Sequence, residues 1–225
     1  MKLVIGNKNY SSWSLRPWLL MRQFDIRFAE VNIALYKPDS RPKLLAYSSA
    51  GKVPVLLDEG ITVWDSLAIA EYLAEKLPAL PIWPRDTQAR ARARSIAAEM
   101  HSGFTALRTH MPMNLRGYYP GQGYEKGVAE DILRITDIWQ DCRRRHASEG
   151  PFLFGEFGAV DAFFAPVVTR FATYGVPLSA VVKEYSAAVM ALPAMQEWKA
   201  DALLETERIA ASEPYSVTRR IPANR

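Results

Sequence analysis

The sequence has a single cysteine, Cys142, among its 225 residues. One cysteine excludes an internal disulfide and every metal site that needs paired cysteines, so a reducing compartment is the simplest fit. No stretch approaches the roughly 18 uninterrupted apolar residues of a membrane-spanning helix. The residues before Asn7 include too few apolar side chains for a signal-peptide core. We therefore expect a cytoplasmic protein with no membrane partner.

An excess of charge of one sign is also lacking. The formal net charge is +4, and three of the positive charges belong to Arg219, Arg220 and Arg225 near the C-terminus. The one internal basic run, RARAR from Arg90 to Arg94, alternates with alanine, and it has no interleaved aromatic side chains on which bases could stack. Such a run is typical of the solvated side of a helix. We expect no nucleic-acid partner.

Several catalytic motifs are missing as well. The sequence has no G-x-S-x-G stretch of a serine hydrolase, no H-E-x-x-H zinc motif and no phosphate-binding P-loop. It also has no C-x-x-C, which argues against a disulfide oxidoreductase, so any thiol chemistry must come from a ligand. No metal is expected. What is present, 49% hydrophobic and 23% charged residues, is typical of a folded soluble protein.

The first 78 residues show the strand pattern of a compact α/β unit. KLVIG, which ends at Gly6-Asn7, is a short run rich in β-branched residues and predicts a buried strand. RFAEVNIAL alternates apolar and polar residues and predicts a second strand. VPVLLD and ITVWD are separated by Glu59-Gly60, which favours a hairpin of two antiparallel strands.

Helical patterns lie between and after these strands. SLRPWLLMRQF predicts a helix with Ser14 as its N-cap and Pro17 in the first turn, where the missing N–H is harmless. SLAIAEYLAEKL, which follows Asp65, predicts an amphipathic helix. The segment KPDSRPKLLAYSSAGK is rich in turn-forming residues and predicts at most a short helix.

A composition change after this unit marks a second one. Pro78, Pro81 and Pro84 indicate a linker over residues 79–86. Beyond it strand patterns vanish, so we expect an all-helical unit over residues 87–212. Its helical patterns cover residues 87–110, 124–148, 160–174, 177–192 and 193–212. The last residues, 213–225, show no period and predict a tail.

Three short stretches of the first unit have patterns suited to binding a ligand. In GKVPVLL a proline opens a strand, which alone marks only an edge strand because proline cannot donate a ladder hydrogen bond. If the Val53-Pro54 bond is cis, however, the backbone N–H and C=O of Val53 become available to an extended peptide lying alongside.

The second stretch is WDSLAI. In the simplest interpretation, Asp65 or Ser66 only caps the following helix. The same pair can also bind a zwitterion, because a helix N-terminus with a hydroxyl binds a carboxylate and Asp65 can receive an ammonium. A ligand with an amino-acid head group would suit this pair.

The third stretch is YSSWSLRPW, residues 10–18. Serine hydroxyls just ahead of a helix N-terminus can donate to an anion, and the helix dipole favours negative charge there. If that anion is a thiolate, the same field lowers the pKa of the thiol and raises the fraction of nucleophile.

In their order and spacing, these stretches resemble those of a glutathione S-transferase. YSSWSLRPW is similar to the serine-type active-site stretch and closest to the Ser-Ser-Cys-x-x-Arg pattern of the zeta class. GKVP resembles the cis-proline turn of the family, and the DS of WDSLAI resembles the acidic-or-Gln/Ser pair that holds a γ-glutamyl group. GEFGAVDAFFAPVVTRF resembles the Ser/Thr-x-x-Asp capping box, with Gly158 in place of the hydroxyl residue and Asp161 retained.

The resemblance covers nearly the whole chain and implies a fold, an α/β thioredoxin-like N-terminal domain over residues 1–78 followed by an all-α C-terminal domain. It implies glutathione as co-substrate, attack of its thiolate on a small hydrophobic electrophile, and a homodimer. Two alternatives stay open. One is a zeta-like, glutathione-dependent isomerase, and the other is a non-catalytic binding protein that uses the same scaffold.

The resemblance also implies a glutathione site. Ser11 or Ser12 would donate a hydrogen bond to the glutathione sulfur, with Ser11 favoured by its spacing to Arg16. The remaining glutathione contacts would come from Trp13, Lys52, Val53, Pro54, Asp65 and Ser66. Val53 would pair with the cysteinyl backbone, and Asp65 and Ser66 would hold the γ-glutamyl end. Lys52 would reach the glycyl carboxylate or remain a solvated turn residue.

A second-substrate pocket is implied between the two units. It would lie near Tyr10, Trp13, His101 and Arg108, with His101 as an acid or base and Arg108 or Arg116 neutralising an acidic substrate. Trp13 stands where the zeta pattern has cysteine. A bulky indole at this place changes the shape of the pocket and limits how far the isomerase reaction of that class can be transferred.

Overall fold

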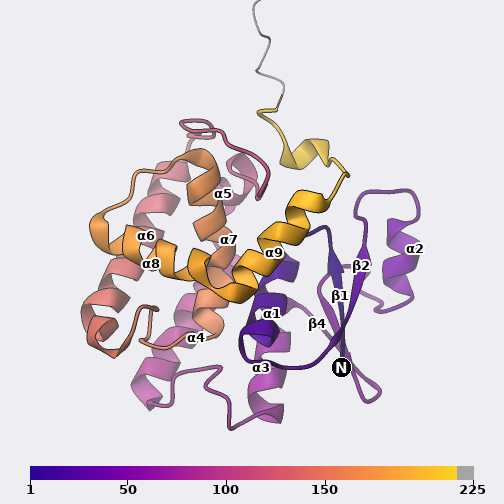
Figure 1. Cartoon of the computed structure of the whole chain (residues 1–225), viewed down its shortest axis with the longest axis horizontal. Coiled ribbons are helices and arrows are strands. Elements are labelled where there is room, and N and C mark those ends of the chain that lie inside the picture. Colours follow the sequence, from indigo (N-terminus) through magenta and orange to yellow (C-terminus); the bar gives the residue numbers. More distant parts are fainter. Residues whose placement is uncertain (217–225) are drawn as a thin grey trace, which may run out of the picture.

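The computed structural model describes residues 1–216, in which a unit with a β-sheet packs beside a bundle of helices (Figure 1). The sheet has four strands in the order β2-β1-β3-β4. They are β1 (Lys2–Gly6), β2 (Ala29–Ile33), β3 (Val55–Asp58) and β4 (Ile61–Trp64). β1 pairs with β2 in parallel, and β3 pairs antiparallel with both β1 and β4. The predicted strands and hairpin are confirmed.

Helices cover both faces of this sheet because β1 is apolar on both sides. The helices of this unit are α1 (Ser12–Gln23), α2 (Ser40–Leu45) and α3 (Ser66–Lys76). Leu3 and Ile5 of β1 lie in the main core together with residues of α1 and α3. Val4 points the other way, since successive side chains of a strand alternate, and packs with Leu44 of α2. The sheet is therefore a middle layer.

The second unit is all-helical, as predicted. Its elements are α4 (Thr87–Ser102), α5 (Thr105–His110), α6 (Val128–His146), α7 (Ala159–Tyr174), α8 (Ala180–Ala191) and α9 (Pro193–Leu204), with short 3₁₀ turns at Ala147–Glu149 and Ala210–Ser212. Every residue of α7 except Ala172 is buried, as expected for a helix that is apolar on all sides. Because α7 packs against α1, α4 and α8, it joins both units into one core.

The first helix begins earlier than the pattern predicts. Its N-cap is Ser11 and its first helical residue is Ser12, so the prediction of Ser14 as the cap is wrong. Ser14 lies in the first turn, and its N–H bonds to the Ser11 side chain at 3.4 Å. Pro17 is consequently beyond the first turn, where it cannot donate to the carbonyl of Trp13 four residues earlier.

The helix predicted over residues 87–110 is divided in two. Phe104 has a left-handed backbone with φ 59°, and α5 starts only after it. At Gly103 a Cβ atom would lie 2.8 Å from the carbonyl oxygen of Glu99, so the chain turns where a side chain has no room. The patterns from residues 124 and 177 become helical only at Val128 and Ala180.

The helix predicted over residues 193–212 ends at Leu204. The next residue, Glu205, has partners outside any helix, because its carboxylate accepts the backbone N–H groups of Lys8 and Asn9 at 2.6 and 3.0 Å. These bonds draw the chain away from the helix axis. They also tie the C-terminal segment to the loop that precedes α1.

Lys8 joins the two units through a buried ammonium group. Its Nζ lies 3.0 Å from Glu30 of β2 and 2.6 Å from Asp201 of α9. The same nitrogen lies over the rings of Trp18 and Trp198, at 4.8 and 5.4 Å from their centroids. The loop between β1 and α1 is therefore fixed by both units.

Asp161 caps the central helix from inside the core. Its carboxylate accepts the N–H of Gly158 at 3.0 Å and that of Leu153 at 3.1 Å. This is the acidic half of the predicted capping box, and Gly158 has no side chain to complete the other half. Burial raises the pKa of Asp161 to about 6, although the two N–H groups oppose this shift.

We expect Asp161 to make the protein less stable as the pH rises. The pKa of an unfolded aspartate is near 3.9, so between about pH 4 and 6 only the folded chain keeps this proton, and the free energy of unfolding falls by about 2 to 3 kcal/mol. Asp161→Asn removes the titration. The unfolding free energies of wild type and variant are measured in urea from pH 4 to 7. The value for wild type minus that for the variant should fall by about 2 to 3 kcal/mol over this range.

The control for this measurement is Glu184→Gln, which changes an exposed carboxyl group of α8 in the same way. Its difference from wild type should stay constant over the same range. A constant difference for Asp161→Asn would contradict the raised pKa.

Candidate functional site

Two adjoining cavities lie beside the N-terminus of α1. The first, of about 590 Å³, is lined by Trp13, Ala50, Lys52, Val53, Pro54, Trp64, Asp65 and Ser66. The second, of about 470 Å³, has Tyr10, Ser11, Leu35, Lys37, Arg41 and Ile209 in its lining. Trp13, Lys52 and Val53 line both cavities, so the two share a wall. The three stretches predicted to bind a ligand therefore meet at one place in the fold.

Ser11 is placed by the helix that it caps. Its Oγ lies 2.7 Å from Ser14 Oγ, and Ser14 Oγ accepts the N–H of Gly6 at 3.1 Å. Ser11 Oγ is the donor of this bond. Because a hydroxyl can rotate, the Ser11 proton can turn from Ser14 toward an anion in the second cavity. The arrangement can donate a hydrogen bond to an anion at the positive end of α1.

Ser12, the other predicted serine, is the first residue of α1 and is also buried. Its hydroxyl has no hydrogen-bond partner within residues 1–216. It lines neither of the two cavities, whereas Ser11 lines the second. The geometry thus favours Ser11 over Ser12 as the residue that can reach a ligand.

The turn before β3 presents unpaired backbone to both cavities. The Val53-Pro54 peptide bond is cis, and β3 begins at Val55. In the part of the chain that the structure describes, no hydrogen bond uses the N–H or C=O of Val53. An extended peptide lying in the shared wall can pair with these two groups.

Asp65 connects the hairpin to α3 in a strained backbone conformation with φ 77°. Its Oδ1 caps α3 by accepting the N–H of Leu67 at 2.8 Å, and its Oδ2 lies 3.2 Å from His101 Nε2. The side chain is still 43% exposed and lines the first cavity. A cation in that cavity can therefore reach the carboxylate.

Arg16 of α1 is a buried cation next to this carboxylate. Its Nη1 donates to Ser66 Oγ at 3.3 Å, and its guanidinium is stacked between the rings of Trp13 and Phe163, at 4.4 and 4.8 Å. The Nε and Nη2 atoms are buried without a partner. Burial, reinforced by the nearby Arg108, holds the pKa of Arg16 well below its usual range.

His101, predicted as an acid or base for the second substrate, belongs to the same group. Its Nδ1 lies 3.4 Å from Arg16 Nη1, and its ring meets Trp13 edge-on at 5.3 Å. Burial lowers the pKa of His101, and the charge of Asp65 opposes this shift. The residue lines neither cavity, because Trp13 occupies the shared wall.

The two arginines predicted near the second substrate are engaged elsewhere. Arg108 donates to the carbonyl oxygens of Met100 and Gly103 at the end of α4, and it meets the cavities only through Trp13, whose ring centroid is 4.9 Å from its guanidinium. Arg116 donates to the carbonyl of Glu207 at 2.6 Å. Neither lines the two cavities.

Tyr10 ties the C-terminal segment to the site. Its hydroxyl donates to the Glu213 carboxylate and accepts from Arg116 Nη2 at 2.6 Å. Burial and the bond to Glu213 raise the pKa of Tyr10. The ring lines the second cavity, as expected, but the hydroxyl is occupied by this cluster.

Part of the second cavity is formed by residues that no sequence motif marks. Lys37 and Arg41 come from the segment expected to be irregular, and Ile209 and Ser212 come from a stretch expected to be helical. No periodic pattern singles them out. Lys37, Arg41 and Lys52 give the second cavity a positive lining, because no carboxylate of residues 1–216 lines it.

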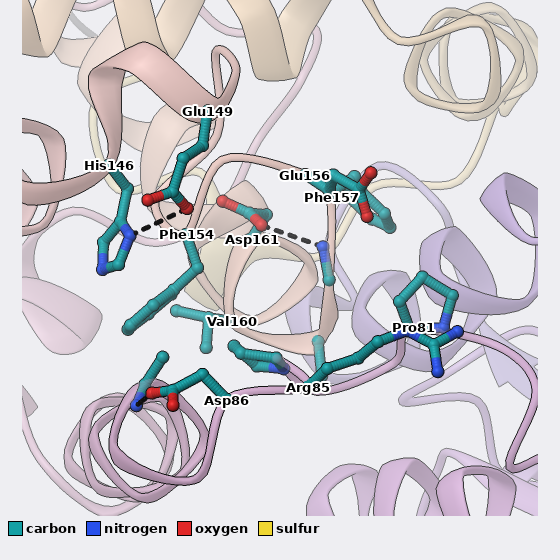
Figure 2. A pocket seen from close by; sticks show the side chains of 14 residues that line it. Pro81, Arg85, Asp86, His146, Glu149, Phe154, Glu156, Phe157, Val160 and Asp161 are labelled. Atoms are coloured by element: carbon teal, nitrogen blue, oxygen red, sulfur yellow. Dashed lines mark hydrogen bonds and ion pairs between the residues drawn. The ribbon is translucent and has the colours of Figure 1, made fainter.

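A third cavity, of about 510 Å³, lies apart from these residues, between the linker, the start of α4 and the start of α7 (Figure 2). Two of its polar side chains have partners of their own. His146 Nδ1 lies 3.1 Å from Glu149, and Asp161 accepts the N–H of Gly158. None of the residues predicted to bind a ligand lines it, so the two adjoining cavities form the candidate site.

Among residues 1–216, no three or more His, Cys, Asp or Glu side chains gather closely enough to hold a metal ion. No helix in this described part combines the length and the apolar character that crossing a bilayer requires.

Known proteins resemble this chain in sequence. Residues 10–76 match the family model of the glutathione S-transferase N-terminal domain. A "Probable maleylacetoacetate isomerase" of Caenorhabditis elegans is 35% identical over 60% of this chain, and the match spans 64% of that protein. The maleylacetoacetate isomerase of Rattus norvegicus is 27% identical over 82% of this chain and 85% of its own length.

Solved structures share the fold. A glutathione transferase homologue from Burkholderia, with bound glutathione, has a TM-score of 0.67 at 23% identity and covers 91% of this chain and 98% of its own. A maleyl pyruvate isomerase, a bacterial zeta-class glutathione S-transferase, has a TM-score of 0.68 at 20% identity, with coverages of 88% and 96%. The predicted thioredoxin-like domain followed by a helical domain is confirmed.

We expect the Tyr10 hydroxyl to stabilise the C-terminal segment. Tyr10→Phe keeps the ring in the cavity wall but removes the group that joins Arg116 to Glu213. Hydrogen bonds to charged groups contribute 1.5 to 3 kcal/mol, so urea unfolding should show a loss of about 2 kcal/mol. Tyr118→Phe is the matched control, since this side chain is 74% exposed. Equal stability of the two variants would contradict the assigned role.

Proposed function

We propose that this chain, a member of the glutathione S-transferase family, binds glutathione in the two adjoining cavities and promotes attack of the glutathione thiolate on a small electrophile. The match of the N-terminal domain and the relatives that extend over most of the chain support this family. The observation that carries the proposal is the meeting of Ser11, Val53 and Asp65 in cavities that share a wall.

Each part of glutathione has a partner of matching chemistry. The unpaired N–H and C=O of Val53 suit the cysteinyl backbone. Asp65 suits the ammonium of the γ-glutamyl group and Ser66 suits its carboxylate. Lys52 lines both cavities and Arg41 lines the second, so either can neutralise the glycyl carboxylate.

Ser11 is the proposed donor to the sulfur, and Ser12 is the second candidate. The Ser11 hydroxyl can turn its proton from Ser14 to the thiolate, and the N-terminus of α1 favours negative charge at the same place. Both effects lower the pKa of a bound thiol, which raises the fraction of nucleophile at neutral pH.

The electrophile would occupy the second cavity, between Trp13, Tyr10 and Ile209. Lys37 adds a positive charge to this otherwise apolar part of the lining. A small hydrophobic electrophile fits the apolar part, and an acidic substituent on it would fit the positive part.

A zeta-like isomerase is the second candidate function. It is favoured by the relatives named maleylacetoacetate isomerase and by the serine stretch. Trp13, which lines both cavities, argues against the isomerase. Its indole is larger than the cysteine of the zeta pattern and leaves less room for a substrate beside Ser11. The third possibility, a binding protein without turnover, retains the same glutathione contacts.

We further propose that the protein is a cytoplasmic homodimer. The single cysteine fits a reducing compartment. Ile61, on the edge strand β4, is 50% exposed, and contact with a second chain would cover it.

The serine assignment is tested by substitution. We expect Ser11→Ala to raise the apparent pKa of bound glutathione by about one unit, because one hydrogen bond to a charged group contributes 1.5 to 3 kcal/mol. Ser12→Ala should have a smaller effect. The measurement is the thiolate absorbance of the complex against pH, with Ser95→Ala, an exposed residue of α4, as control. If neither serine variant shifts the pKa, the assignment fails.

The candidate functions are separated by turnover. Calorimetric titration with glutathione comes first, followed by conjugation assays over a panel of electrophiles and an isomerisation assay with maleylacetoacetate. We expect binding and conjugation. Binding without any turnover would favour the non-catalytic protein, and efficient isomerisation without conjugation would favour the second candidate function.

A further inference from the structure

We propose that His101, on helix α4 of the helical unit, is a positioning residue for the γ-glutamyl end of glutathione. It connects Asp65, the proposed partner of the ligand ammonium, to Arg16, which bonds to Ser66. The inference rests on the proposed function, because it concerns a part of the same site. It extends that site beyond the N-terminal domain that carries the three ligand-binding stretches.

The neighbours of His101 determine which ring nitrogen carries the proton. Arginine has donors only, so Nδ1, 3.4 Å from Arg16 Nη1, is the acceptor. Nε2 then carries the proton of the neutral ring and faces Asp65 Oδ2, 3.2 Å away. A neutral imidazole in this tautomer satisfies both neighbours at once.

The contact between His101 Nε2 and Asp65 Oδ2 completes the orientation of the Asp65 carboxylate. Oδ1 is held by the N–H of Leu67 and Oδ2 by His101, on a backbone whose left-handed conformation is maintained only by its surroundings. A carboxylate oriented in advance loses less freedom when an ammonium arrives. Because the neutral ring adds no positive charge, Asp65 keeps its own charge for the ligand.

The other side of His101 acts on the partner of the ligand carboxylate. By accepting from Arg16 Nη1, it helps to hold the guanidinium where the same nitrogen donates to Ser66 Oγ at 3.3 Å. Ser66 is therefore an acceptor toward Arg16, and its hydroxyl proton is left for the ligand. The buried positive charge of Arg16, with two donor atoms unpartnered, lies on the side where the ligand is negative.

The test compares two ligands, so that general damage is distinguished from loss of positioning. Glutathione and its analogue without the α-amino group are titrated calorimetrically into wild type and His101→Ala. We expect the variant to bind glutathione about tenfold more weakly, the effect of losing one charge-assisted hydrogen bond. Its affinity for the analogue should fall by less, at most about threefold, because the analogue has no ammonium for Asp65 to bind and keeps only the carboxylate that faces Ser66.

Two conservative variants separate the contacts of His101. The amide nitrogen of glutamine can take the place of Nε2, so His101→Gln should keep most of the affinity for glutathione. Asparagine reaches only the place of Nδ1, so His101→Asn should resemble alanine. The control is His146→Ala, because His146 pairs with Glu149 in the third cavity, away from the candidate site. This variant should bind both ligands as wild type does.

The pH profile gives a readout that a packing role would not move. Asp65, Arg16 and Arg108 are the charged groups around His101. When the ring protonates, it pairs more strongly with Asp65 and turns a second N–H toward Arg16, so it competes with the ligand ammonium. Wild type should lose affinity for glutathione as the pH falls below the ordinary histidine range near 6.5, and His101→Gln should not show this loss.

The possible outcomes are distinct. An equal loss for both ligands would show that His101 only supports the packing around Trp13, and unchanged binding of glutathione by His101→Ala would likewise overturn the inference. Both results leave the proposed function standing. If wild type does not bind glutathione at all, the proposed function fails and the inference fails with it.

Discussion

The candidate site depends on the burial of one positive charge, the ammonium of Lys8. Its two carboxylate partners come from different units, Glu30 from the sheet and Asp201 from the last helix, so neither unit alone can satisfy it. Loss of either carboxylate would leave the buried ammonium with one partner fewer, which destabilises the docked units. The loop that carries Ser11 is therefore held at both sides, and the second cavity, which Ile209 and Ser212 also line, takes its shape from both units.

Polar contacts between the units continue from this point around the site. Asn9 Nδ2 donates to Asn114 Oδ1 at 2.9 Å, and Arg116 connects Tyr10 to the C-terminal segment. Most of these groups satisfy one another, and Arg16, with its unpartnered nitrogens, is the exception. Buried donors without partners are rare in folded proteins. Arg16 bonds to Ser66, which lines the first cavity, so its positive charge favours a negatively charged ligand group there.

Sequence patterns predicted most elements and the three stretches that meet at the candidate site, because strands, helices and caps are local features. They failed where a distant group decides. Ser11 rather than Ser14 caps α1, and Ser14 instead bonds to Gly6, eight residues away. The last helix stops where Glu205 turns toward Lys8. The contact of His101 with Asp65 follows from the docking of α4, and no spacing in the sequence encodes it.

The distribution of tryptophan in this fold gives the protein an internal optical reporter. Of the six tryptophans, only Trp13 and Trp64 are exposed to a substantial extent, at 37% and 50%, whereas the other four are at most 5% exposed. Both exposed indoles line the first cavity. Emission that responds to solvent and to quenchers therefore comes from this cavity, and its occupation can be followed by fluorescence without any label.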